Sequence, residues 1–352
     1  MSDPQSVAIT SPIPGDPTER FAAALPAGVP LLIADDSNGK LTFTRGRQST
    51  FLFDYEEQRR VLGDSLYAEF QKFHKSAACR NFAHYMAYKE GYDLIVSLDY
   101  DCVVPEGYLE KHRAALGKKE VTIRKSSSGW VNPLENELWF SRGYPYSKRI
   151  PGAQVEERTE NGRVVLNMGL WENVVDINGI DKVMGPAPSR FVTARDYTAV
   201  DGFIPLCGMN NMFLREIVPA YFFIPNVKVG NWELSRHDDI WGGYIFQVLA
   251  KKQGDLISYG EPVVFHERES NQSRVLYHEH SMHVLESYFY ALVDAAAMNV
   301  SRGGYLDMFA AFSDAFASEL SRRKQEYPAH YFAAFQDIAA ALNLWTTLFQ
   351  KL

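Results

Sequence analysis

Apolar and polar positions along the first hundred residues predict strands that are separated by helices. Residues 6–10 and 29–34 are short apolar runs, and between them Asp16 precedes Pro17, with Glu19 three residues after Asp16. Asp is a favoured helix N-cap, Pro fits the first helical turn, and an acidic residue three positions after the cap can bond back to it. A strand, a helix and a strand in this length predict a βαβ unit with parallel strands.

Residues 94–98 predict the central strand, because this run is apolar, rich in branched side chains and too short for a helix. Asp99 and Asp101 follow it at once, and Pro105 ends the extended segment. Side chains two apart on an extended chain point to the same side, and open α/β sheets bind ligands beyond the carboxyl ends of their strands. The pair indicates a Mg²⁺ or Mn²⁺ site against a diphosphate, although the motif alone fits a solvated strand end equally well.

Further charged residues stand at predicted element boundaries. Asp35 and Asp36 close the second strand, where a carboxylate can bond a ribose or base. A solvated turn is the alternative, which we favour for Asp36 but not for Asp35. Lys75 and Arg80 flank the start of a predicted helix over 77–90, where free backbone N–H groups already favour anions. We therefore expect Asp35, Lys75 and Arg80 to contact a nucleotide.

Residues 137–149 predict an irregular loop, because Gly143 and Pro145 interrupt any regular element. Aromatic side chains alternate there with cations, an arrangement that suits sugar stacking beside phosphate or carboxylate contacts. The alternative is a surface loop whose aromatic bodies cover apolar surface. The three cations are Arg142, Lys148 and Arg149.

Two later segments also carry candidate chemistry. Asp238 and Asp239 fall in the first turn of a predicted helix over 238–252, where the helix dipole favours acidic residues. The dipole explains one of these residues, but it explains the group of His, two Asp and Trp less easily. The last predicted strand, 256–265, ends at His266. We expect this histidine to join the acidic pair after the central strand, and the equally open alternative is a structural histidine at a strand end.

From residue 275 onward, apolar side chains repeat with helical spacing. We divide the chain into a catalytic domain, 1–273, and a helical region, 274–352. Such apolar faces pack on their own domain or on a partner subunit in a homo- or hetero-oligomer, and both arrangements stay open. Three histidines in this region lack a nearby carboxylate or cysteine, so we interpret them as surface residues and not as a metal site. They are His278, His280 and His283.

Composition narrows the class of protein. The 352 residues are 46% hydrophobic and 22% charged, with a formal net charge of −7 and no block of Lys and Arg, so neither nucleic acid nor an anionic membrane is an expected partner. No apolar run is long enough to span a membrane, and residues 1–14 lack the features of a signal peptide. Three cysteines without C-x-x-C spacing indicate a reducing compartment, so we expect a cytoplasmic protein. They are Cys79, Cys102 and Cys207.

Six segments, taken in order, resemble the reversibly glycosylated polypeptides, the family that includes the plant UDP-arabinopyranose mutases. Each motif alone is weak, whereas six in the same order with similar spacing are specific. The resemblance runs from about residue 5 to 345. The segments are 75–80, 97–102, 142–149, 169–176, 205–210 and 236–243.

The resemblance implies a GT-A-type α/β fold with a mixed central sheet, a bound Mn²⁺ (or Mg²⁺) and a UDP-sugar substrate. Arg142 corresponds to the arginine that becomes glycosylated in the family, and Arg149 to a second arginine needed for activity. Tyr100 departs from the plant pattern of three consecutive Asp, but Asp99 and Asp101 on either side remain. The motifs add three nucleotide- or sugar-binding candidates: Gly208, Asn210 and Trp241.

The implied reaction interconverts pyranose and furanose forms of a UDP-sugar. We expect Asp101 and His266 to bind the metal, with Asp99 contacting it through water or the ribose. Asp238 or Asp239 then stabilises the positive charge that forms when UDP leaves. Two alternatives share these residues: a glycosyltransferase with a glycan or protein acceptor, and a non-catalytic subunit that binds a nucleotide sugar.

Overall fold

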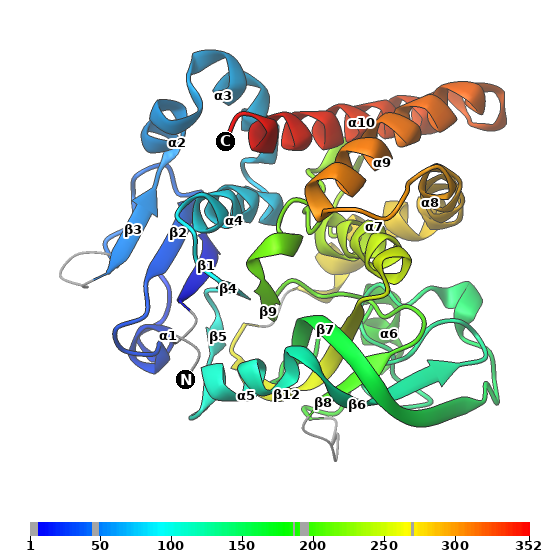
Figure 1. Ribbon diagram of the computed structural model, residues 1–352, viewed down its shortest axis with the longest axis horizontal. Helices are drawn as coiled ribbons and strands as arrows, with labels where there is room; N and C mark the ends of the chain where they lie inside the picture. Colours follow the sequence, from blue (N-terminus) through cyan, green and yellow to red (C-terminus); the bar gives the residue numbers. More distant parts are fainter. Residues whose placement is uncertain (1–5, 44–48, 186, 191–196, 269–270) are drawn as a thin grey trace.

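The computed structural model describes residues 6–43, 49–185, 187–190, 197–268 and 271–352. Within them, ten strands form one mixed sheet with helices around it, which confirms the predicted α/β class (Figure 1). The strand order is β3-β2-β1-β4-β9-β7-β6-β8-β12-β5. The strands are β1 (Val7–Ile13), β2 (Leu31–Asp35), β3 (Thr50–Phe53), β4 (Leu94–Leu98), β5 (Cys102–Val103), β6 (Gly117–Ser126), β7 (Val155–Asn173), β8 (Tyr197–Val200), β9 (Asn210–Leu214) and β12 (Leu256–His266).

The first four strands in the order are parallel, as the βαβ pattern predicted. Ile9 lies opposite Leu31 in the β1–β2 pair, and Val7 lies opposite Leu94 in the β1–β4 pair. The predicted cap of the first helix, α1 (Glu19–Ala24), was wrong. Thr18 is the N-cap and accepts from the backbone N–H of Phe21 at 3.1 Å. The carboxylate of Asp16 instead accepts backbone bonds from residues 42 and 43, and so ties the helix entry to a distant loop.

The second half of the sheet is mixed, and it brings the chemistry of two distant segments together. β9 runs antiparallel to both β4 and β7, whereas β12 runs parallel to β7. At its end β12 also pairs with the short β5, which places His266 opposite Cys102. This pairing sets the last strand beside the acidic residues that follow β4.

Helices pack on both faces of the sheet (Figure 1). The two helices that carry predicted site residues, α4 and α7, begin at Arg80 and Asp238. The helices after α1 are α2 (Tyr55–Leu62), α3 (Asp64–Phe70), α4 (Arg80–Lys89), α5 (Tyr108–Ala115), α6 (Gly179–Met184), α7 (Asp238–Gln253), α8 (Gln272–Met298), α9 (Tyr305–Arg322) and α10 (Ala329–Gln350). A separate hairpin is formed by β10 (Val227–Val229) and β11 (Trp232–Leu234).

Helices α8 to α10 pack on the same chain, so one of the two arrangements left open is present. Trp241 of α7 is fully buried and stacks on Phe289 of α8, with ring centroids 4.1 Å apart. The indole N–H of Trp345 in α10 donates to the carbonyl of Pro219 at 3.0 Å. One apolar core includes residues from both sides of the boundary we placed at 273. No helix of the described residues is long and apolar enough to cross a membrane.

Candidate active site

A cavity of about 550 Å³ opens beyond the carboxyl end of β4. It is bounded by the segment before α4, the first turn of α7, the end of β12 and the first turns of α8. Eight of the residues predicted from the sequence line it, so the structure brings segments from across the chain to one site. They are Lys75, Arg80, Asp99, Asp101, Arg142, Asp238, Asp239 and His266.

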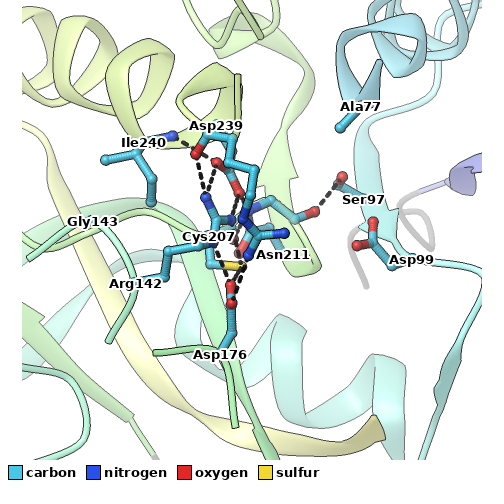
Figure 2. Close-up of polar contacts among 12 residues, drawn as sticks. Ala77, Ser97, Asp99, Arg142, Gly143, Asp176, Cys207, Asn211, Asp239 and Ile240 are labelled. Atoms are coloured by element: carbon cyan, nitrogen blue, oxygen red, sulfur yellow. Dashed lines mark hydrogen bonds and ion pairs between the residues drawn. The ribbon is translucent and has the colours of Figure 1, made fainter. Parts of the chain in front are cut away.

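One wall of the cavity is a set of charged side chains centred on Arg142. Its guanidinium donates to Asp176 at 2.7 Å and to both carboxylate oxygens of Asp239 at 3.0 and 2.5 Å (Figure 2). It also donates to the carbonyl of Arg236 at 2.7 Å, and its remaining N–H points to the sulfur of Cys207 at 3.8 Å. Arg142 is only 7% exposed. Its hydrogen-bonding capacity is therefore used inside the protein.

The charges in this wall stabilise one another. Burial raises the pKa of Asp176, but the nearby cations Arg142 and Arg236 outweigh burial and hold that pKa well below its usual range. Asp239 behaves in the same way: Arg142 overcomes the effect of burial and lowers the pKa of the carboxyl. Arg236 is held in turn by Glu279 of α8 at 2.8 Å. We call Arg142, Asp176, Asp239, Arg236 and Glu279 the arginine network.

Asp238 stands beside this network but does not belong to it. One of its carboxylate oxygens, Oδ2, is buried and has no hydrogen-bond partner among the described residues. Burial, with the charge of Asp239 in addition, raises the pKa of Asp238 to about 7. Neighbouring acidic residues of one helical turn thus have opposite environments. Asp239 is a fixed anion, and Asp238 is a carboxyl group that can change its protonation state.

Arg80 fixes the first of the two aspartates after β4. Its guanidinium donates to Asp99 at 2.6 Å, to the carbonyl of Gly208 at 2.7 Å and to Ser97 at 2.9 Å. Burial lowers the pKa of Arg80, but the carboxylates around it, Asp99 first, raise it above its usual value. Because the side chain is 3% exposed and bonded on all sides, Arg80 orients Asp99 and leaves little of itself for a ligand.

Asp101 and His266 meet at the other side of the strand end. The Nε2 atom of His266 lies 3.7 Å from a carboxylate oxygen of Asp101. Its Nδ1 lies 2.7 Å from the carbonyl of Val174 and so carries a proton. Burial lowers the pKa of His266, but the hydrogen bond to Asp101 and the charge of Asp101 raise it above its usual value, so a protonated Nε2 faces the Asp101 carboxylate. Among the described residues, no group of three or more His, Cys, Asp or Glu is placed to hold a metal ion.

Lys75 approaches the cavity from the segment before α4. Its backbone N–H donates to Asp36 at 2.8 Å, while its ammonium group makes no ion pair with another described residue. Asp35, which we expected at the nucleotide, does not line the cavity. Its carboxylate accepts backbone bonds from Ser37 at 2.7 Å and Gly39 at 2.8 Å, which is the turn that we had kept as the alternative.

Arg149 also lies away from the cavity. It makes a two-pronged ion pair with Asp181 of α6 at 2.8 and 2.6 Å. Its guanidinium is sandwiched between the rings of Phe140 and Tyr146, 4.5 and 4.1 Å from their centroids. Lys182, next to Asp181, lines the cavity. Through its ion pair with Asp181, Arg149 holds α6, the helix that carries Lys182.

The three remaining candidates from the motifs support the site from behind. The backbone N–H of Gly208 donates to Asp239 at 3.0 Å, and a Cβ at this position would lie 2.4 Å from the ring of Phe223. Asn210 is fully buried, and its amide donates to the carbonyls of Leu170 and Pro262. Trp241 is in the core. None of these three residues lines the cavity.

Residues outside our candidate list complete the cavity wall. His278, which we expected at the surface, is partly buried, lines the cavity and lies 3.2 Å from the hydroxyl of Ser235. Asp176, Cys207 and Arg236 lay inside the recognised segments, so the motifs offered a signal for them that we did not use. Other lining residues had no motif: Lys182, Asn226, Glu233, Arg268 and Arg274.

Comparison with known proteins gives the same family. Residues 31–352 match the family described as "Reversibly glycosylated polypeptide". UDP-arabinopyranose mutase 3 of Arabidopsis thaliana is 30% identical over 232 residues, which cover 62% of this chain and 59% of that protein. Probable UDP-arabinopyranose mutase 1 of Pisum sativum is 31% identical over 238 residues, with the same two shares. UDP-arabinopyranose mutase 1 of Oryza sativa subsp. japonica is 28% identical over 232 residues, again 62% and 59%.

These matches span about three fifths of the length of the curated relatives. The family match, in contrast, covers most of this chain and includes every segment that forms the cavity wall. One conclusion accounts for the order of the six segments along the sequence, for the mixed sheet and for the cavity where those segments meet. The chain belongs to the reversibly glycosylated polypeptide family.

Proposed function

We propose that this protein is a UDP-sugar mutase-like enzyme that interconverts pyranose and furanose forms of its substrate with the help of a divalent metal ion. One observation carries the proposal. Asp101 and His266, which suit a metal–diphosphate group, line one cavity together with two aspartates. The pKa of one of these aspartates, Asp238, is raised, and that of the other, Asp239, is lowered. The relatives named as mutases support the choice of reaction.

The residues present fit a divalent cation. Asp101 and His266 would supply one oxygen and one nitrogen ligand, and these two atoms are 3.7 Å apart. The hydrogen bond from Nδ1 to the carbonyl of Val174 fixes the ring with Nε2 toward Asp101, and a metal would replace the proton on Nε2. Diphosphate oxygens and water would complete the coordination, as is usual for Mg²⁺ and Mn²⁺ at nucleotide sites. When bound, the metal would neutralise the diphosphate as it leaves the sugar.

The chain itself would supply binding and positioning. Lys75 and Arg268, both exposed at the cavity, are suited to the diphosphate, because neither makes an ion pair with another described residue. Arg80 would hold Asp99 in the orientation that the metal or ribose needs. The arginine network would form a rigid wall beside the sugar, with its charges already balanced.

A sugar bound covalently to Arg142 fits this geometry poorly. Attack by a guanidinium requires loss of a proton, and the two carboxylates around Arg142 raise its pKa well above the usual value despite the opposing effect of burial. We therefore propose that Arg142 positions Asp176 and Asp239, and that any sugar transfer to it requires these contacts to open. Radiolabelled UDP-sugar followed by peptide mapping tests this point, since label on Arg142 would contradict a purely positioning role.

The decisive test is incubation of the purified protein with UDP-arabinopyranose and Mn²⁺ but no acceptor. A new furanose isomer in the product mixture would establish a mutase. Hydrolysis, or turnover only after a glycan is added, would identify a glycosyltransferase, and binding without turnover would identify a non-catalytic subunit. Excess EDTA should abolish turnover, and Asp101→Asn should weaken Mn²⁺ binding in the presence of UDP by at least about tenfold, or 1.4 kcal/mol. Asp93→Asn, at the opposite end of β4, is the matched control.

A further inference from the structure

The protein holds the two neighbouring aspartates at the start of α7 to different extents. Asp239 accepts two bonds from Arg142, one from the backbone of Gly208 and one from the backbone of Ile240. Asp238 is 6% exposed, and its Oδ2 atom has no partner in the described residues. A buried oxygen without a hydrogen bond is costly and therefore needs an explanation. Its position in the cavity wall provides one, because a ligand there can become the partner.

Charges face Asp238 from several elements. Asp239 adjoins it on α7, Arg142 approaches from the loop after β6, and Arg80 comes from the start of α4. Burial first and Asp36 next raise the pKa of the Cys79 thiol in the turn before α4, and Asp238 is close enough to add to this effect. Both arginines are already bonded to other carboxylates, Asp99 in one case and Asp239 in the other. Neither arginine neutralises Asp238 fully, so its carboxyl can take up and release a proton.

The proposed reaction needs such a group once it is written with its atoms balanced. UDP leaves with the electron pair of the bond to the anomeric carbon, and the ring oxygen shares the positive charge. A ring hydroxyl then attacks the anomeric carbon and must lose its proton. Next, the bond from that carbon to the original ring oxygen breaks, its electron pair stays on the oxygen, and this oxygen must gain a proton. UDP finally attacks the anomeric carbon of the new ring.

We propose that Asp238 carries this proton: its carboxylate accepts the proton from the attacking hydroxyl and returns it to the original ring oxygen. No proton is gained or lost overall, so a single carboxyl group suffices. This inference rests on the proposed mutase function. It assigns Asp239 and Arg142 to positioning, since their hydrogen bonds leave no capacity for a proton that moves. Proton transfer by a positioned side chain contributes about 10²- to 10⁴-fold to enzymatic rates.

Positional isotope exchange separates the proton step from the departure of UDP. UDP-arabinopyranose carries ¹⁸O in the bridge between sugar and β-phosphate, and reversible departure of UDP scrambles this label into the other β-phosphate oxygens. We expect Asp238→Asn to scramble the label while forming the furanose isomer about 100-fold or more slowly than the wild type. Asp238→Glu should recover part of the isomerisation. Asp307→Asn, which removes an acidic residue from the first turn of α9 outside the cavity, is the control.

Two results would overturn the inference while leaving the mutase function intact. Isomerisation by Asp238→Asn at the wild-type rate would show that another group carries the proton. Loss of both scrambling and isomerisation in a variant that still binds UDP would assign Asp238 to the departure of UDP. A wild-type protein that scrambles the label but never forms a furanose would contradict the mutase function, and the proton transfer with it. Calorimetric titration with UDP shows that each variant is folded at the site.

Discussion

The two walls of the cavity differ in how far the protein satisfies its own charges. In the arginine network, Arg142 and Arg236 are held by three carboxylates, all buried. On the opposite side Lys75, Asp101 and His266 face the cavity with few protein partners. A charge that is already neutralised has little to offer a ligand, whereas an unpaired one pays a desolvation cost that a ligand can relieve. The first wall should therefore determine stability and the second should determine binding.

The largest expected effect tests the arginine network. Arg142→Ala should lower the free energy of unfolding by about 3–5 kcal/mol, because Asp176 and Asp239 would stay buried without their cation. Urea denaturation at neutral pH measures the change. Arg59→Ala breaks an exposed pair with Asp64 and is the control, for which we expect no measurable loss. A loss for Arg142→Ala as small as that of the control would show that the network does not stabilise the protein.

Substitutions on the side of the cavity that carries Lys75, Asp101 and His266 should change the affinity for a ligand but not the free energy of unfolding. Lys75→Ala should weaken the affinity for UDP by about 2–3 kcal/mol, the range of a hydrogen bond to a charged group. Isothermal titration with UDP measures this loss. The unfolding free energy should not change, because the ammonium group makes no ion pair with another residue that the structure describes. Lys72→Ala, an exposed lysine outside the cavity, serves as the control. Unchanged UDP affinity with lost turnover would move Lys75 to the sugar side.

Asp238 and Asp239 should respond to pH in opposite directions. The raised pKa of Asp238 means that its contribution to stability is present at low pH and is lost as pH rises toward and past 7. The lowered pKa of Asp239 means that its contribution is present above the usual carboxyl pKa and is lost as pH falls through the folded-state value.

At pH 8, Asp238→Asn should therefore be more stable than the wild type, by a difference on the order of 1–3 kcal/mol. The difference should vanish near pH 4. Asp239→Asn should be less stable than the wild type at pH 8. Thermal or urea unfolding across this range measures both variants. Equal pH dependence of the two variants would refute the contrast between the residues.

The smallest effect concerns a residue that acts from a distance. Arg149→Lys keeps the charge but loses the two-pronged bond to Asp181, so α6 and its Lys182 should be held less firmly. We expect turnover of UDP-arabinopyranose to fall about fivefold, the equivalent of about 1 kcal/mol. If Arg149 acts through Lys182, the double variant with Lys182→Ala should be no slower than Lys182→Ala alone. Additive losses would indicate a separate role for Arg149.

The fold was predictable where neighbouring segments determine it. The apolar runs 6–10, 29–34 and 94–98 became β1, β2 and β4 because short branched runs between turn signals have few other uses. The meeting of Asp101 with His266 depends instead on the pairing of β12 with β5, which are far apart in sequence. No local pattern encodes that pairing, and the sequence offered only two carboxylates after one predicted strand and a lone histidine after another.

The site was predictable as a set of residues but not as a set of contacts. Arg142 and Arg149 look alike in sequence, since both lie in one loop rich in aromatic residues. Arg142 lies between Asp176 and Asp239, whereas the rings of Phe140 and Tyr146 hold Arg149 on Asp181. The difference depends on where the segment after β7 places Asp176 and where α6 places Asp181. Loop composition alone therefore indicates charge and stacking, and the tertiary fold decides which partner each guanidinium finds.

The packing of α8 has a consequence for the protein during its synthesis. Arg274 and His278 in its first turns close the cavity, and its later residues are held in the core by stacking between Phe289 and Trp241. Emerging from the ribosome, a chain that ends before α8 has the strands and both aspartates of α7 but lacks one wall of the site. Domains form as units while the chain is extended. If the cavity is the proposed nucleotide site, the nascent polypeptide should be unable to retain nucleotide until α8 has emerged and docked, so that binding would be a late event in the maturation of each new molecule.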